Sequence, residues 1–155
     1  MKRFLLSISA RSLASVSIAL LVAGSAYAKE SAFEHEIKSR QDIFASIEDK
    51  SDLVENLLDE DKPDWQKIML NSQHLVAHAA SLKALFPIGS HEGSRAKVFV
   101  WEKPEKFNQL LMELNMGFQQ LETASQRNML SEAEAGLERA QASCKSCHRI
   151  NRSLW

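Results

Sequence analysis

Apolar side chains recur three and four residues apart over most of this chain, which is the spacing of one face of an α-helix. Turn residues and prolines divide the pattern into four stretches, at about 33–58, 65–86, 104–121 and 131–148. The second stretch keeps a seven-residue repeat, which packs helices at shallow angles. No stretch is convincing as a β-strand. The pattern predicts an all-α fold, an antiparallel four-helix bundle.

Local signals suggest where these helices begin and end. Pro63 and Pro104 suit the first turn of a helix, and Ser131-Glu132-Ala133-Glu134 fits a capping box for the last one. Phe86-Pro87-Ile88-Gly89 ends the second helix, and residues 87–103 are predicted to form a long loop. We expect a loop of this length to pack on something or to serve a site.

The last predicted helix ends in Cys144-Lys145-Ser146-Cys147-His148, a C-x-x-C-H string. Two thiols three residues apart can add to the two vinyl groups of one porphyrin, and the adjacent imidazole can bind its iron. Cys144 and His148 are four residues apart, so all three side chains share one helix face. The motif predicts one haem c inside the bundle, covalently bound through Cys144 and Cys147, with His148 as the metal ligand.

Other uses of a Cys-x-x-Cys pair are a zinc half-site, a redox pair and a disulfide. Zinc wants a second ligand pair, and the chain has no other cysteine. A thioredoxin-like pair would follow a strand in a βαβ unit, and nothing in this sequence has that pattern. Haem attachment is therefore the favoured interpretation.

The first 28 residues are predicted to be a cleaved signal peptide. Lys2 and Arg3 give a basic start, Leu13 to Ala23 is mostly apolar, and Ala26-Tyr27-Ala28 is an A-x-A cleavage site. The apolar run is too short to span a membrane. We expect a single domain over residues 29–155, located in the periplasm, where haem attachment would also consume two otherwise reactive thiols.

Charge argues against one class of partner. Residues 1–28 hold three basic and no acidic residues, so the mature chain has 16 Lys and Arg against 20 Asp and Glu, a net charge of −4. Haem propionates would add negative charge. The balance argues against a nucleic-acid partner.

Four features occur in the order, and close to the spacing, of one known family. They are Arg40-Gln41 in the first helix, Phe86 to Ser90 after the second, Trp101 in the loop, and the string from Cys144 to Arg152. With C-x-x-C-H near the C-terminus of a four-helix bundle, the chain resembles the cytochromes c′, the class II c-type cytochromes. The resemblance covers essentially all of residues 29–155.

The resemblance implies roles for individual residues. Cys144 and Cys147 would be the thioether anchors and His148 the proximal iron ligand. Arg152 matches a basic residue beside the proximal haem face, and Arg40 matches an arginine close to the haem propionates. Trp101 joins the candidate cofactor-binding residues. Because Arg40 falls on the apolar stripe, where an unpaired charge is costly, a solvated position is less expected for it.

The sixth coordination position of the iron decides between branches of the family. In the low-spin branch a Met follows the helix-one arginine by four residues and binds iron, whereas the gas-binding branch has an apolar residue. Here that residue is Phe44, which has no lone pair to donate. We predict a five-coordinate, high-spin iron under a dry pocket. Side chains weighed as other ligands, and expected to serve as core or surface residues, are Met69, Met112, Met116, Met129, His74 and His78.

Three functions compete. A pocket lined by Phe44 gives bound dioxygen little polar stabilisation, but nitric oxide and carbon monoxide need no donor, so binding of small diatomic gases is favoured. The resemblance implies that nitric oxide can release His148. Electron transfer in a respiratory chain is the alternative. An enzyme such as a peroxidase ranks last, since no acid–base residue is placed opposite His148.

The resemblance also implies a homodimer through the first two helices. Ile43, Leu53 and Leu57 lie off the core stripe and suggest a second contact face. The sequence does not identify a redox partner protein, and no membrane span is expected after residue 28.

Overall fold

Four long helices form the molecule. The computed structural model describes residues 32–153. The long helices are α1 (Glu34–Leu58), α2 (Trp65–Ser81), α4 (Pro104–Gln126) and α5 (Leu130–Asn151). Two short elements, the 3₁₀ helix η1 (Leu82–Leu85) and α3 (Phe99–Glu102), lie between α2 and α4. The predicted signal peptide, residues 1–28, lies outside the described residues.

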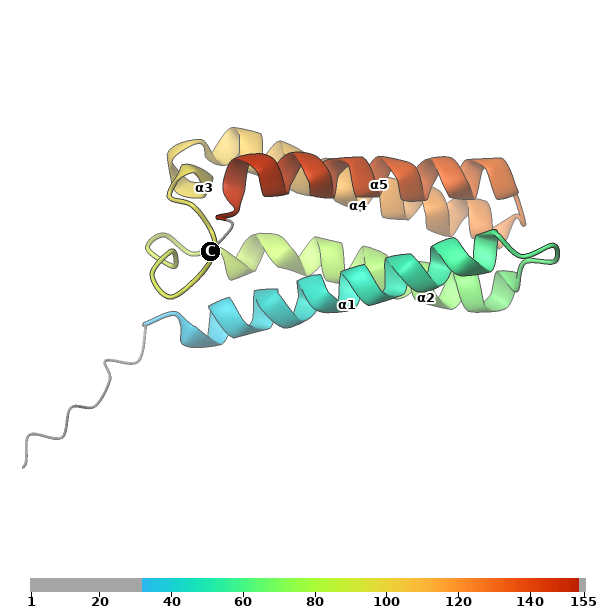
Figure 1. The fold of residues 1–155 in the computed structure, drawn as a ribbon, viewed down its shortest axis with the longest axis horizontal. Helices are drawn as coiled ribbons and strands as arrows, with labels where there is room; N and C mark the ends of the chain where they lie inside the picture. The colour runs from blue at the N-terminus through green and yellow to red at the C-terminus, as the bar shows by residue number, and fades with distance from the viewer. Residues whose placement is uncertain (1–31, 154–155) are drawn as a thin grey trace, which may run out of the picture.

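The helices run antiparallel, with α1 beside α2 and α4 beside α5 (Figure 1). The α1–α2 and α4–α5 turns meet at one end of the bundle. The segment between α2 and α4 lies at the other end, beside the C-terminal end of α5. Residues 32–153 contain no β-strand, only one isolated bridge between Ala96 and Arg152. The prediction of an all-α four-helix bundle is confirmed.

Two of three local expectations are corrected. Pro63 lies before α2, because Asp64 is the N-cap and its carboxylate accepts a hydrogen bond from the backbone N–H of Lys67 at 3.1 Å. Ser131 is inside the first turn of α5 rather than at its N-cap, which is Met129, so no capping box forms. Pro104 does occupy the first turn of α4.

The predicted second helix and loop also change in detail. The α-helical geometry ends at Ser81 and continues as η1 to Leu85. Pro87 removes a backbone donor and restricts Phe86, so the helix cannot extend further. The predicted loop 87–103 contains the single turn of α3.

The core runs along the bundle axis and draws on all four long helices. Its fully buried members include Val54, Ile68, Leu75 and Leu121. Leu57 also belongs to this core, and Ile43 and Leu53 pack against it, so these three residues do not form a separate exposed face. Within residues 32–153, no helix combines the length and apolar character needed to cross a membrane.

Candidate haem site

A cavity of about 770 Å³ opens between α1, α4, α5 and the loop before α3. Its volume lies within the range of small-molecule and cofactor sites. Its apolar lining comes mainly from Phe44, Ile47, Phe86, Ala96, Val100, Phe107, Leu110, Leu111, Leu114 and Phe118. The structure thus places one large, mostly apolar chamber at the end of the bundle where the C-x-x-C-H string lies.

One wall of the cavity is the last turns of α5. Cys144, Cys147 and His148 all line it, as their spacing predicts. Both cysteines are free and partly buried. Burial raises the pKa of each thiol.

The imidazole of His148 is poised to act as a ligand. Burial, followed by the positive charge of Arg152, lowers its pKa. At neutral pH the ring is therefore uncharged and keeps a nitrogen lone pair for a metal. On the same turn, the Asn151 amide donates a hydrogen bond to Sγ of Cys147 at 3.6 Å.

Phe44 lines the cavity from α1. Its ring meets that of Phe86 edge-on at 6.4 Å between centroids, and Phe86 lines the cavity as well. The sequence placed Phe44 in the site but did not identify Phe86 as a wall residue, since Phe86 was assigned to the end of the second helix and to the features shared with the family. The one sequence signal for this role of Phe86 was its position directly before Pro87.

Arg40 is buried, with 3% of its surface exposed. Its guanidinium donates to the backbone oxygen of Leu85 at 3.0 Å and to Oγ and the backbone oxygen of Ser90 at 2.8 and 2.6 Å. Burial lowers the pKa of Arg40. No carboxylate of residues 32–153 forms an ion pair with it, so its positive charge at the cavity edge suits an anionic group such as a propionate.

Trp101 is the predicted site residue that the structure does not bring to the cavity wall. It lies one layer behind, with its ring 6.3 Å from that of Phe86. Arg152 does line the cavity, as the resemblance implies. Its backbone forms the isolated bridge to Ala96, which ties the loop before α3 to the end of α5.

Three carboxylates of α1 also line the cavity and were missed: Glu48, Asp52 and Glu55. All three are exposed. The negative charge of Glu48 favours the protonated forms of His148 and Cys144, although burial has a larger effect on the pKa of each group. Their spacing of four and three residues, starting four residues after Phe44, was a signal that they share its helix face.

The other candidate ligands lie elsewhere. None of Met69, Met112, Met116 and Met129 lines the cavity. His74 is exposed, as expected, whereas His78 is partly buried and forms a hydrogen bond with Ser46 at 3.1 Å. Within residues 32–153 no cluster of three or more His, Cys, Asp or Glu side chains is arranged to hold a metal ion, so the cysteine pair has no partners for a zinc site.

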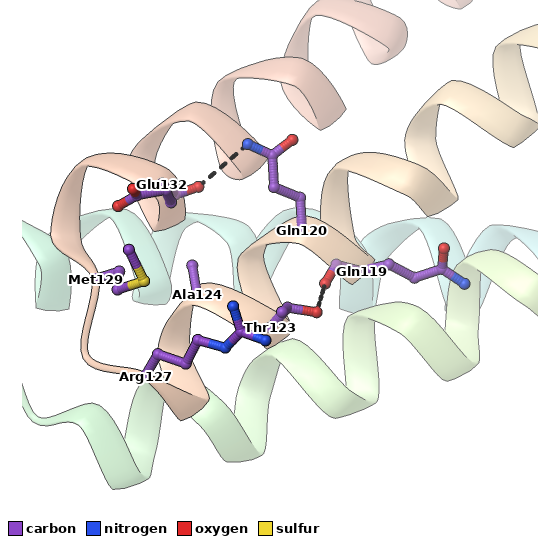
Figure 2. Close-up of a pocket in the computed structure, with 7 residues that line it drawn as sticks. All are labelled: Gln119, Gln120, Thr123, Ala124, Arg127, Met129 and Glu132. Carbon is purple, nitrogen blue, oxygen red and sulfur yellow. Dashed lines mark hydrogen bonds between the residues drawn. The ribbon is translucent and has the colours of Figure 1, made fainter.

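A second pocket, of about 430 Å³, lies at the opposite end of the bundle beside the α4–α5 turn (Figure 2). It is lined by polar side chains including Gln119, Gln120 and Arg127. Gln120 spans it by donating to the backbone oxygen of Glu132 at 3.4 Å. It offers no thiol or imidazole, so the chemistry of the chain is concentrated in the first cavity.

The first cavity fits a haem. It combines an apolar chamber, two free thiols on one helix turn, a neutral imidazole beside them and a buried guanidinium that has no ion-pair partner among residues 32–153. A family model described as Cytochrome C′ matches residues 35–152. The chain belongs to the cytochrome c′ family. Members of this family bind haem c.

Solved structures of cytochromes c′ share the fold. The protein from Thermochromatium tepidum is 21% identical, covers 77% of this chain and 95% of its own, and has a TM-score of 0.71. The protein from Shewanella frigidimarina is 20% identical, with 77% and 95% coverage and a TM-score of 0.72. A ferrous variant from Alcaligenes xylosoxidans with bound nitric oxide is 24% identical, with 79% and 96% coverage and a TM-score of 0.72. The search of curated proteins finds no match.

Proposed function

We propose that this cytochrome c′ carries one haem c with a five-coordinate, high-spin iron that binds small diatomic gases such as nitric oxide and carbon monoxide. One observation carries the proposal. The described cavity lining contains a single imidazole, that of His148, and no methionine, while Phe44 lines the α1 side. A phenyl ring cannot donate a lone pair, so the position across from His148 would stay open.

Each group of cavity residues would have a separate role. Cys144 and Cys147 would hold the haem by thioether bonds, and His148 would supply its one protein ligand. When bound, the haem iron supplies the coordination position that a diatomic ligand occupies. Phe44, Phe86 and Phe107 would make the cavity wall around that position apolar. Nη1 and Nη2 of Arg40 donate to Leu85 and Ser90, which holds the guanidinium against the loop after η1.

One relative, solved as two variants, supports this assignment. Structures of variants of the Alcaligenes xylosoxidans cytochrome c′ contain bound nitric oxide. They are 24% identical to this chain and share its fold. We extend this class of ligand to the present protein because Phe44 would leave the coordination position beside it open.

The absorption spectrum of the reduced protein, with and without carbon monoxide, tests the proposal. A high-spin spectrum that shifts on addition of the gas is expected, because an open coordination position accepts it. A low-spin spectrum that carbon monoxide does not change would overturn the proposal and favour electron transfer instead.

Phe44→Met sharpens the test, because a thioether at this position can bind the iron. The variant should turn low-spin and lose most of its response to carbon monoxide. Phe107→Met is the matched control, since Phe107 is also a cavity-lining phenylalanine but stands on α4. It should stay high-spin. Equal spectra for the two variants would contradict the role assigned to Phe44.

We further propose a periplasmic, non-enzymatic homodimer. One solved relative is a cytochrome c′ with a ligand-controlled dimer dissociation. The three carboxylates that line the cavity are exposed to solvent, which does not favour a role as an acid–base group across the iron. Fractionation with N-terminal sequencing, sedimentation with and without carbon monoxide, and a peroxidase assay against free haem check these three points.

A further inference from the structure

The ring of Phe86 is enclosed by four side chains. The Arg40 guanidinium carbon lies 4.5 Å from its centroid, a cation–π contact. The ring centroids of Phe107, Trp101 and Phe44 lie at 4.7, 6.3 and 6.4 Å. Arg40 and Phe107 are themselves buried. Phe86 therefore has little room to change rotamer.

The backbone beneath this ring is held as firmly. Nε1 of Trp101 donates to the backbone oxygens of Phe86 and Pro87 at 3.2 and 2.9 Å. Arg40 takes the preceding oxygen, that of Leu85, at 3.0 Å. Three consecutive carbonyl groups are thus bound by two side chains from other parts of the chain. The proline ring removes further freedom from this segment.

Phe44 is held less tightly. Among the described residues, its one aromatic contact is with Phe86. Its side chain is half-buried and faces the cavity from α1. Of the two rings, Phe44 is the one that can swing, and Phe86 is the fixed wall against which it packs.

We infer that Phe86 is a second determinant of gas entry, and that Trp101 is a positioning residue which acts through Phe86 from outside the cavity. The inference rests on the proposed function, because it concerns how a gas reaches the position beside Phe44. A rigid Phe86 limits the directions in which Phe44 can move aside. If the wall yields, Phe44 can move further and a gas enters faster.

Trp101→Phe tests this inference, because it keeps an aromatic ring but removes the donor to Phe86 and Pro87. The rate of carbon monoxide association with the reduced protein should rise on the order of fivefold, because the loss of about one hydrogen bond lowers the barrier to movement of Phe86. Trp65→Phe is the matched control. Trp65 is also partly buried against the core, but it is the first residue of α2, at the end of that helix away from η1, and it does not line the cavity.

Two further variants separate failure of this inference from failure of the proposed function. Phe44→Ala should speed carbon monoxide association if Phe44 covers the iron, and Phe86→Leu should speed it if Phe86 is the wall. A reduced parent protein whose spectrum carbon monoxide does not change overturns the proposed function and the inference with it. Carbon monoxide binding at an unchanged rate in Phe44→Ala overturns the inference alone. A faster Phe44→Ala, together with Trp101→Phe and Phe86→Leu rates equal to that of Trp65→Phe, overturns the inference alone. Thermal unfolding of each variant identifies rate changes that follow stability only.

Discussion

At the scale of single residues, Arg40 shows how a charge can occupy an apolar helix face. Its charge would be costly to bury without partners. The fork-shaped guanidinium reaches Leu85 and Ser90, and its face lies over the Phe86 ring. These contacts need a planar group with several fixed donors, which lysine does not have.

Arg40→Lys should therefore destabilise the protein by about 2–3 kcal/mol, because a lysine cannot replace the set of charged hydrogen bonds. Urea unfolding followed by circular dichroism measures the change. The matched control is Arg139→Lys, at an exposed residue whose ion pair is with Glu113 at 2.7 Å. Exposed pairs contribute about 0–1 kcal/mol. Equal losses in the two variants would contradict the role of the buried contacts.

Local spacing was enough to predict which side chains of α5 face the same cavity. Cys144, Cys147 and His148 are one helix turn apart and line the cavity together. Phe44 lines it as well. Trp101 was placed among the cofactor-binding residues, but it lies behind Phe86, because the direction of its side chain depends on how the loop folds over α4.

At the scale of elements, α4 and α5 form the closest pair in the bundle. Gly117 and Gly136 make this possible, since a Cβ added at Gly117 would lie 2.6 Å from the backbone nitrogen of Ala140 and 2.8 Å from the oxygen of Gly136. The contact is backbone to backbone, so no flexible side chain can move aside. Close contact of these helices aligns the α5 turn that carries the cysteines with the cavity wall of α4.

Gly117→Ala should destabilise the protein by about 1–3 kcal/mol, because the helices must move apart. Alanine favours an isolated helix over glycine by about 1 kcal/mol, so helix propensity predicts the opposite sign. Urea unfolding of Gly117→Ala shows which of these two changes in the free energy of unfolding is larger. Ala142→Gly, at an exposed position of α5, measures the propensity effect alone. A more stable Gly117→Ala variant would show that the α4–α5 contact is looser than described.

Helix existence was predictable and helix ends were less so. The apolar period identified all four long helices, because their burial depends on a repeated face. The ends depend on single contacts. Asn128, and not a capping box at Ser131, determines where α5 begins. Its φ of 54° and the hydrogen bond from its backbone N–H to the Ser125 oxygen end α4, and Asn128 lies two residues before the first residue of α5.

At the scale of the whole molecule, His78 makes stability depend on pH. It links α2 to α1 through Ser46. Burial, and then the positive charge of Lys50, lowers its pKa. The folded chain therefore takes up this proton less readily than the unfolded chain, whose histidine titrates near pH ~6.5. The contribution of His78 is present above that pH and is lost as the pH falls through the lowered pKa.

His78→Gln should weaken the dependence of the melting temperature on pH between about pH 7 and pH 5. His148, whose pKa is lowered as well, contributes equally to both proteins and cancels in the comparison. His35→Gln is the control, since His35 is an exposed residue of α1, and it should follow the parent. A variant His78→Gln with the full slope of the parent would contradict this account.

The four-helix class and the shared face of Cys144, Cys147 and His148 could be predicted from the sequence, because each depends on spacing within one helix. The role expected of Phe44 came from the resemblance to the family. Only the tertiary structure decided what surrounds the turn that carries the two cysteines. The partners of Arg40 lie 45 and 50 residues away, Trp101 supports the wall instead of forming it, and Leu57 belongs to the core. Such contacts depend on how the helices pack together and on the path of the loop across the end of the bundle. The apolar periodicity of a single helix predicts neither of these.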